Sequence, residues 1–236
     1  MKGNSDRREL KWIGLGLYTI PEAHQMTHVP AATIRRWIKG YRYRRAGGFA
    51  EAPSVWQGDL LFDGQRPALT FLDLLDVRVV DSFRKHGVRW AIIREAAQIA
   101  CDIFGSNHPF SRKRFRTDGK RIFVDLERSG HRRLLDVSGR QFVFEDVIAR
   151  TLYEGIEFDK ESEEAQRWYP LWPSKAIVVD PNRAFGRPIA ARSGVPADIL
   201  AAAANVEGSE AFTARTYEVS LSEVRAALEW HKRLAA

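Results

Sequence analysis

Six basic side chains gather within eleven residues that contain no acidic side chain: Arg35, Arg36, Lys39, Arg42, Arg44 and Arg45. The guanidinium group presents planar N–H donors that match phosphate oxygens and the edge of guanine. Tyr41 and Tyr43 stand among the arginines and add hydroxyl groups that bond to phosphate. The segment therefore predicts a surface that binds a polyanion, with nucleic acid as the first candidate.

The residues before and within this cluster show two short helical periodicities. Apolar side chains recur at Ile20, Ala23 and Met26, and again at Ile34, Trp37 and Ile38. Val29-Pro30 separates the two runs, Thr19 is placed to cap the first, and Gly40 ends the second. The pattern predicts a helix, a tight turn and a second helix over residues 20–39, with the basic side chains on and directly after the second helix.

The cluster continues into a segment of alternating polarity. We expect a two-stranded wing made of Tyr41–Arg45 and Val55–Phe62, with loops at Gly47-Gly48 and Pro53-Ser54. In a winged helix-turn-helix the N-terminal residues of the second helix meet the bases in the major groove, and the wing lies against phosphates. The residues expected to contact DNA are Ala31, Ala32, Thr33, Arg35, Arg36, Lys39, Tyr41, Arg42, Tyr43, Arg44 and Arg45. The competing interpretation is a solvated basic face on an unrelated helix pair.

The middle of the chain predicts helices followed by β-hairpins. Residues 70–104 form two amphipathic helices broken at Gly87. Asp118-Gly119 and Ser138-Gly139 are turn dipeptides flanked by apolar segments, so we expect a small four-stranded antiparallel insert, followed by a helix. The basic run from Arg112 to Arg121 either extends the nucleic-acid surface or solvates a hairpin of this insert.

The last part of the chain predicts a linker and a second helical domain. An acidic run leads into a segment rich in aromatic residues and proline, which we interpret as a linker or docking segment. A short strand at 176–179 and helices at 196–206 and 222–234 follow, with a loop between the helices and Ser220 or Ser222 as a cap.

These elements predict a fold of the α+β class that is mostly α. The expected domains are a winged-helix DNA-binding domain at 1–110, a β-hairpin insert and helix at 111–156, an acidic and aromatic linker at 157–174, and a small helical domain at 175–236. The chain has 236 residues, of which 44% are hydrophobic, which suffices for folded domains. Its formal charge of +7 favours an anionic partner.

Side chains that catalysis or metal binding would require are scattered. Cys101 is the only cysteine, lies in an apolar run and is expected to be a core residue in a reducing compartment. His24 and His28 are four residues apart, but no catalytic glutamate accompanies them. The sequence has no nucleophile motif, phosphate-binding loop or dinucleotide fingerprint. We therefore expect no enzyme, no cofactor and no metal, and, because no signal-like or membrane-spanning apolar segment is present, a cytoplasmic protein.

The N-terminal half resembles the MerR type of winged helix. The resemblance lies in Tyr18–Ala23, Val29-Pro30, Thr33–Trp37 and the stretch from Leu69 to Glu95, and it covers roughly residues 17–104. It implies DNA binding through the second helix and the wing. The chain lacks the long dimerisation coiled coil and the metal-binding cysteines of the metal sensors in that family, so inducer sensing does not carry over.

The C-terminal part resembles the homeodomain-like domain of unknown function found in VapB-type antitoxins. The resemblance lies in Ile177–Ile189, Val195-Pro196, Ile199-Leu200 and Leu221–Leu228. A MerR-like N-terminus joined to this domain is the arrangement of a VapB subgroup. It implies an antitoxin that represses its own operon and neutralises a PIN-domain ribonuclease toxin. The chain departs from the pattern at Arg192-Ser193-Gly194, where Gly-Thr-Arg is usual, and in a longer segment from Glu207 to Thr216.

The expected partners are thus operator DNA, a PIN-domain toxin and a second copy of the chain in a homodimer, with no membrane. Large aromatic side chains dominate many protein interfaces, so the residues expected to contact the toxin are Trp168, Tyr169 and Trp172. The competing interpretation, which is the more common use of such a segment, is that these residues and the neighbouring prolines form a strap folded onto the core. The alternative is a MerR-like transcriptional regulator whose C-terminal domain senses a ligand or mediates dimerisation. An enzyme or nuclease subunit is disfavoured because acids and histidines do not cluster in the sequence.

Overall fold

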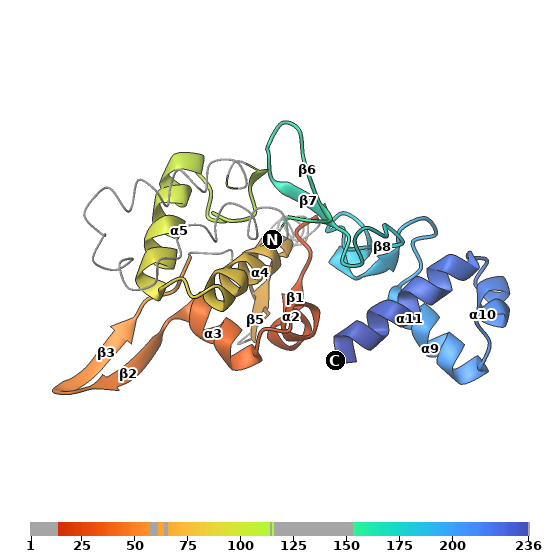
Figure 1. The fold of residues 1–236 in the computed structure, drawn as a ribbon, viewed down its shortest axis with the longest axis horizontal. Coiled ribbons are helices and arrows are strands. Elements are labelled where there is room, and N and C mark those ends of the chain that lie inside the picture. Colours follow the sequence, from red (N-terminus) through yellow and green to blue (C-terminus); the bar gives the residue numbers. More distant parts are fainter. Residues whose placement is uncertain (1–13, 57–60, 64–65, 114, 116–152, 236) are drawn as a thin grey trace, which may run out of the picture. The chain divides into compact units, whose positions relative to one another are not determined.

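The computed structural model describes residues 14–56, 61–63, 66–113, 115 and 153–235, which fall into two compact units (Figure 1). The N-terminal unit comprises Tyr18–Tyr153 and Lys160–Glu164, and the C-terminal unit comprises Met1–Leu17, Glu154–Asp159 and Ala165–Ala236. The chain passes between the units more than once, so the domain boundaries expected from the sequence do not coincide with these units.

The helix pair predicted for residues 20–39 is present as α2 (Ile20–Thr27) and α3 (Ala31–Lys39). Thr19 caps α2: its hydroxyl accepts the Glu22 N–H, while the Glu22 carboxylate accepts the Thr19 N–H over 2.7 Å. His28 ends α2 in the left-handed conformation, with φ at 57°. The apolar positions that defined the two periodicities are buried, so the pattern reflects packing of both helices on one core.

The hairpin after α3 differs from the expected one. β2 (Tyr41–Arg45) pairs antiparallel with β3 (Gly48–Ala52), so the second strand begins seven residues earlier than predicted. Val55 and Trp56 suggested a strand because they are apolar, but they are apolar because both side chains are buried in the core. The predicted strand at Val55–Phe62 was therefore wrong at Val55 and Trp56, residues 57–60 lie outside the described residues, and Leu61 and Phe62 belong to strand β4 (Leu61–Asp63). Ala46-Gly47 forms the turn of the hairpin.

A small sheet and two helices complete the described part of the N-terminal unit. β1 (Tyr18–Thr19), β5 (Arg66–Leu69) and β4 (Leu61–Asp63) form an antiparallel sheet in that order. The predicted amphipathic helices are α4 (Phe71–Lys85) and α5 (Trp90–Phe104), with the expected break at Gly87. Phe83, Phe110 and Phe115 pack edge to face in the core below them. Most of the predicted β-hairpin insert at 111–156 lies outside the described residues.

The C-terminal unit begins with structure where the sequence suggested a linker. β6 (Ile156–Phe158) and β7 (Ala165–Trp168) pair as an antiparallel hairpin. The Trp168 N–H and C=O exchange hydrogen bonds with Val179, and its ring lies edge-on to Trp230 at 6.1 Å between centroids. The prediction of a linker at 157–174 was wrong because these aromatic side chains are core residues of this unit.

In the C-terminal unit, helix α11 (Leu221–Ala235) packs against two short strands. β8 (Ile177–Val178) pairs with β9 (Ile189–Ala190), and η3 (Ala184–Gly186) lies between them. The predicted helices are α9 (Ala197–Glu207) and α11 (Leu221–Ala235), and Ser220 caps α11 by accepting the Glu223 N–H. The loop expected between them contains α10 (Glu210–Thr216) instead. No helix in the described ranges is both long and apolar enough to cross a membrane.

Candidate nucleic-acid interface

Helix α3 has one buried face and one basic exposed face. Ile34, Trp37 and Ile38 are buried, with at most 5% of each side chain exposed. The predicted DNA-contacting residues occupy the other face: Ala32, Arg35, Arg36 and Lys39 are exposed, and Ala31 and Thr33 are half-buried. The buried triplet therefore fixes the rotation of the helix so that the basic side chains face outward.

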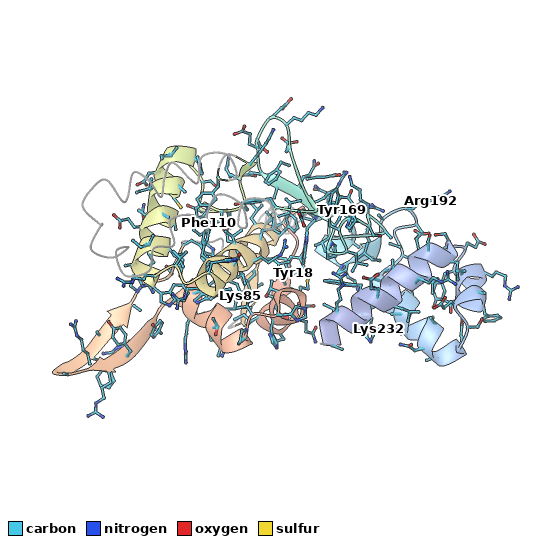
Figure 2. All side chains as sticks on the ribbon, viewed as in Figure 1. Tyr18, Lys85, Phe110, Tyr169, Arg192 and Lys232 are labelled. Atoms are coloured by element: carbon cyan, nitrogen blue, oxygen red, sulfur yellow. The ribbon has the colours of Figure 1, made fainter. Side chains whose placement is uncertain are left out.

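Hairpin β2–β3 continues this basic face. All five residues of β2, Tyr41, Arg42, Tyr43, Arg44 and Arg45, are exposed. The guanidinium carbon of Arg36 lies 5.8 Å from the centre of the Tyr41 ring, which joins the helix surface to the strand surface. Figure 2 shows the hairpin side chains projecting away from the body of the N-terminal unit. The structure thus brings all eleven predicted residues onto two adjoining elements.

The junction between α3 and the hairpin is tightly constrained. Gly40 has φ at 69°, and a Cβ at this position would lie only 2.4 Å from the carbonyl oxygen of Ala52. The Val55 N–H donates a hydrogen bond of 2.7 Å to the carbonyl of Trp37, at the end of the helix. Only glycine accommodates both the backbone conformation and the close approach. The direction of the hairpin relative to α3 is set by these contacts.

The turn between α4 and α5 adds a basic element that the sequence analysis did not assign to this surface. The rings of Trp37 and Trp90 lie edge to face at 5.4 Å, so the start of α5 packs against α3. Arg84 lies over the Trp90 ring at 4.6 Å, and Lys85 and Arg89 in the same turn are exposed. The basic residues around Gly87 are visible in the sequence. That they lie beside α3 depends on the contact between Trp37 and Trp90, which are 53 positions apart.

Acidic side chains are sparse on α3 and hairpin β2–β3, whereas Lys85 in the neighbouring turn pairs with Asp81 over 2.7 Å. Residues 31–50 contain no Asp or Glu. The first acid beyond them, Glu51, has Oε1 3.4 Å from Nε of Arg42, its cross-strand neighbour. Because both side chains are more than 70% exposed, the pair is screened by water and salt, and the surface keeps a positive potential.

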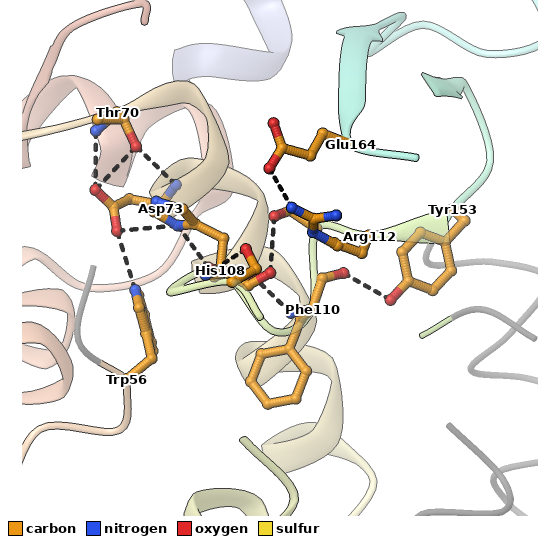
Figure 3. A network of polar contacts seen from close by, with 11 residues as sticks. Trp56, Thr70, Asp73, His108, Phe110, Arg112, Tyr153 and Glu164 are labelled. Atoms are coloured by element: carbon orange, nitrogen blue, oxygen red, sulfur yellow. Dashed lines mark hydrogen bonds and ion pairs between the residues drawn. The ribbon is translucent and has the colours of Figure 1, made fainter. Parts of the chain in front are cut away.

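A buried polar network supports the base of the hairpin (Figure 3). The Trp56 indole N–H donates to Oδ1 of Asp73 over 3.0 Å, and Thr70 donates its N–H and hydroxyl to Oδ2 of the same carboxylate. His108 Nδ1 lies 3.1 Å from Asp76 Oδ2, and the Phe110 N–H donates to Asp76 Oδ1. The network ties the segment after the hairpin to α4 and to residues 108–110.

Burial governs the charge of this network. The Asp76 side chain is inaccessible to solvent, and desolvation raises its pKa from 3.8 to about 6, although the hydrogen bond and charge of His108 oppose the shift. Oxygen and nitrogen atoms of Asp73, Asp76 and His108 lie within 4.8 Å of one another. Three of the four carboxylate oxygens accept hydrogen bonds from N–H or hydroxyl groups, and the fourth, Asp76 Oδ2, lies 3.1 Å from Nδ1 of His108. The geometry is that of a structural polar network.

His24 and His28, the pair considered in the sequence, lie in a different setting. The Nδ1 atom of His24 lies 2.9 Å from the carbonyl oxygen of Val29, within the turn between α2 and α3. His28 forms the left-handed cap of α2. Both residues therefore have a local role in shaping the turn that precedes the basic helix.

The aromatic side chains expected to contact a partner divide into two groups. Trp168 and Tyr169 are buried, with 5% and 9% of their surface exposed, so the expectation that they are surface anchors was wrong. Trp172 is 44% exposed, and Nζ of Lys175 lies 5.7 Å from its ring centre. Lys175 also binds Glu157 over 2.7 Å, which lowers the pKa of that carboxyl.

Comparisons with known proteins place the chain in a family. No protein-family model matches it. A protein of Mycobacterium tuberculosis (strain ATCC 25618 / H37Rv) named "Putative antitoxin VapB45" is 30% identical over 200 residues, which cover 78% of this chain and 81% of the relative. The crystal structure of Rv2018 from Mycobacterium tuberculosis has a similar fold, with a TM-score of 0.66, 23% identity and coverage of 92% of this chain and 98% of that one. On the extent of the first of these matches, this chain belongs to the VapB family of antitoxins.

Proposed function

We propose that this antitoxin binds operator DNA through α3 and hairpin β2–β3, and thereby represses its own operon. The observation that carries the proposal is the continuous exposed surface formed by the basic helix face and by β2, joined at Arg36 and Tyr41. The antitoxin family supports a regulatory role for the chain rather than a catalytic one. A helix with one basic face followed by a projecting hairpin is the form that a winged helix-turn-helix uses to bind DNA.

In this proposal each element has a distinct task. Ala31, Ala32, Thr33 and Arg35 lie in the N-terminal half of α3, which enters the major groove and reads base edges. Arg36, Lys39 and the β2 side chains bind phosphates on either side of that groove. Lys85 and Arg89, in the turn that Trp90 holds against Trp37, extend the phosphate contacts. The chain binds as a homodimer, since two such surfaces read half-sites about one turn of DNA apart.

The partner of the antitoxin is proposed to be a PIN-domain ribonuclease. Membership in the VapB family implies a toxin partner, and the resemblance of residues 177–228 to the antitoxin domain supports the proposal that this partner is of the PIN class. Trp172 is the one of the three expected anchors whose side chain is substantially exposed, so we assign it to the toxin contact.

Gel shifts with the DNA immediately upstream of the reading frame test the DNA-binding part. Charge reversal at Arg35→Glu with Arg36→Glu is expected to abolish specific binding. The matched control is Arg192→Glu with Lys232→Glu, which changes the net charge equally at exposed positions of the C-terminal unit and is expected to leave specific binding in place. If both double variants lose specific DNA binding equally, net charge alone explains the loss, and a specific role for α3 is refuted.

Co-purification with the product of the neighbouring reading frame tests the toxin part. Wild-type antitoxin is expected to form a stable complex and to block cleavage of RNA by that product. Trp172→Ala is expected to weaken the complex, whereas Phe212→Ala, which removes another half-exposed aromatic of the C-terminal unit, leaves it intact. A neighbouring product without ribonuclease activity would overturn the assignment to a PIN-domain toxin.

A further inference from the structure

Phe49 is a large apolar side chain with no place in the core. It is 71% exposed, whereas Ala52 is the only residue of β2 and β3 that is buried. Leaving a phenylalanine in water forgoes most of the free energy that its burial would supply, on the order of 2 kcal/mol. The fold of the N-terminal unit therefore gives no packing reason for phenylalanine at this position.

The strand register separates the hairpin into two chemically different faces. Side chains of directly paired residues lie on the same face, so Phe49 shares a face with its partner Arg44, and with the pair Arg42 and Glu51. The opposite face carries Tyr41, Tyr43 and Arg45; the two tyrosine rings lie 5.9 Å apart. Arg36 of α3 contacts Tyr41, so the tyrosine face continues the surface of the basic helix.

The Phe49 face combines an apolar ring with two guanidinium groups. Arg42 lies with its guanidinium carbon 5.5 Å from the centre of the Phe49 ring, and Arg44 is directly across the strand pair. The minor groove of B-DNA has the complementary chemistry, because deoxyribose rings form its apolar walls and phosphates line both rims. Apolar side chains inserted at this groove, flanked by arginines, are a general means of holding and kinking DNA.

We propose that hairpin β2–β3 enters the minor groove next to the major-groove site of α3, with its tyrosine face against the phosphates between the two grooves. Phe49, on the opposite face, is then a wedge in the minor groove, and Arg42 and Arg44 bind phosphates on the far rim of that groove. This inference deepens the proposed function and depends on it. The amino group of guanine occupies the floor of the minor groove, so the wedge favours base pairs that lack this group. Phe49 thereby gives the antitoxin a sequence preference at positions that α3 does not reach.

A structural role for Phe49 makes a different prediction. A cation–π contact with Arg42 stabilises a hairpin by about 0.5–1 kcal/mol at an exposed site, and it requires an aromatic ring. A wedge requires only apolar bulk, since leucine and methionine also serve in this role. Phe49→Leu therefore separates the two: a wedge keeps its function in this variant, and a cation–π scaffold loses it.

The experiment measures binding of the full chain to two duplex copolymers, poly(dI-dC) and poly(dG-dC). Inosine presents the same major-groove edge as guanine but lacks the minor-groove amino group, so the comparison isolates the minor groove. Wild-type protein and Phe49→Leu are expected to prefer the inosine duplex roughly tenfold, and Phe49→Ala to lose that preference. Phe212→Ala, an exposed phenylalanine of the C-terminal unit, is the control and keeps it.

The outcomes distinguish this inference from the proposed function. If wild-type protein binds its upstream DNA and Arg35→Glu with Arg36→Glu abolishes that binding, the proposed function stands. An unchanged inosine preference in Phe49→Ala, or its loss in Phe49→Leu, then overturns the wedge alone. If Phe49→Ala weakens the complex with the toxin and leaves both duplexes bound as before, Phe49 belongs to a protein interface. Absence of DNA binding by the wild-type chain overturns both proposals.

Discussion

The indole N–H of Trp56 donates a hydrogen bond of 3.0 Å to Oδ1 of Asp73, 17 residues further along the chain. Both side chains are buried, and Asp73 also accepts the N–H and hydroxyl of Thr70 at the start of α4. Trp56 follows hairpin β2–β3 by four residues. This bond therefore links the residues that follow hairpin β2–β3 to α4, a helix with many core residues of the N-terminal unit.

Loss of this bond is expected to destabilise the N-terminal unit. Trp56→Phe leaves Oδ1 of a buried carboxylate without its donor, which costs about 1–3 kcal/mol in addition to the lost packing. A double-mutant cycle with Asp73→Ala, which removes the acceptor, isolates the hydrogen bond, and urea unfolding of the four proteins gives the free energies. A coupling energy close to zero would show that the two side chains contribute independently, contrary to the geometry.

The raised pKa of Asp76 predicts a pH dependence of stability with a definite sign. Because the folded-state pKa of about 6 exceeds the unfolded value of 3.8, the stability associated with Asp76 is full below pH 3.8 and is lost as pH rises through about 6. The shift corresponds to roughly 3 kcal/mol as an upper bound for this group. Asp76→Asn removes the titration but retains a carbonyl oxygen that accepts the Phe110 N–H.

The measurement compares wild-type protein with Asp76→Asn between about pH 4 and pH 7. Relative to wild type, the variant is expected to gain stability as the pH rises to about 6, and the difference levels off above that pH. Other carboxyl groups act in the opposite direction: Lys175 lowers the pKa of Glu157, and Ser220 and Ser193 lower that of Glu223. These groups are common to both proteins and cancel in the difference. Parallel pH profiles of the two proteins would contradict the assignment of the raised pKa to Asp76.

The junction glycine is predicted to be more sensitive than the turn glycine. Gly40→Ala places a Cβ 2.4 Å from the Ala52 carbonyl, whereas Gly47→Ala, also at a positive φ, meets no atom within 4 Å. Both variants incur the backbone cost of alanine at a positive φ, about 1–3 kcal/mol, and Gly40 also has ψ at −179°, a region that is essentially restricted to glycine. We expect Gly40→Ala to cost a further 1–3 kcal/mol, roughly, and to weaken DNA binding because the hairpin shifts relative to α3. Thermal unfolding measures the stability of the two variants, and gel shifts measure their DNA binding. Equal effects of Gly40→Ala and Gly47→Ala would show that the backbone near Ala52 moves away from the added Cβ at no cost.

Sequence patterns identified those elements whose signals are local. The cap at Thr19, the stop at Gly40 and the break at Gly87 lie within a few residues of the helices that they bound, and the corresponding helix ends agree with the structure. Helix α10 was missed because its seven residues give fewer than two full turns of periodicity, although Ser209 caps it by accepting the Phe212 N–H.

Tertiary contacts decided the features that sequence alone did not predict. Trp168 looked like a surface anchor because acids and prolines surround it, but it packs on Trp230, 62 residues away. Val55 and Trp56 looked like a strand because burial and strand pairing select the same apolar residues. The basic cluster was recognisable because charge density is a property of the sequence itself. Its extension to Lys85 and Arg89 depended on the contact between Trp37 and Trp90.

Removal of the single acid on the Phe49 face is expected to strengthen DNA binding. Glu51 holds Arg42 with a distance of 3.4 Å between Nε and Oε1, and it repels the phosphates that the hairpin approaches. Glu51→Gln removes this repulsion and releases Arg42 for a phosphate contact. The salt dependence of the binding constant should steepen by about one counterion, and the affinity at low salt should rise several-fold. Stability should change little, because an exposed pair contributes about 0–1 kcal/mol.

Glu210→Gln provides the matched control for this variant. Glu210 pairs with Arg225 over 2.8 Å at an exposed site of the C-terminal unit, so the substitution makes the same charge change in a comparable ion pair. Titrations with the upstream DNA at two salt concentrations are expected to show a gain for Glu51→Gln that shrinks as salt rises, since screening weakens the contribution of exposed charges. Glu210→Gln should leave the binding curve close to that of wild-type protein. If Glu51→Gln instead weakens DNA binding, the prediction is wrong. The ion pair with Glu51 would then hold Arg42 in the position that it needs for DNA before the DNA binds.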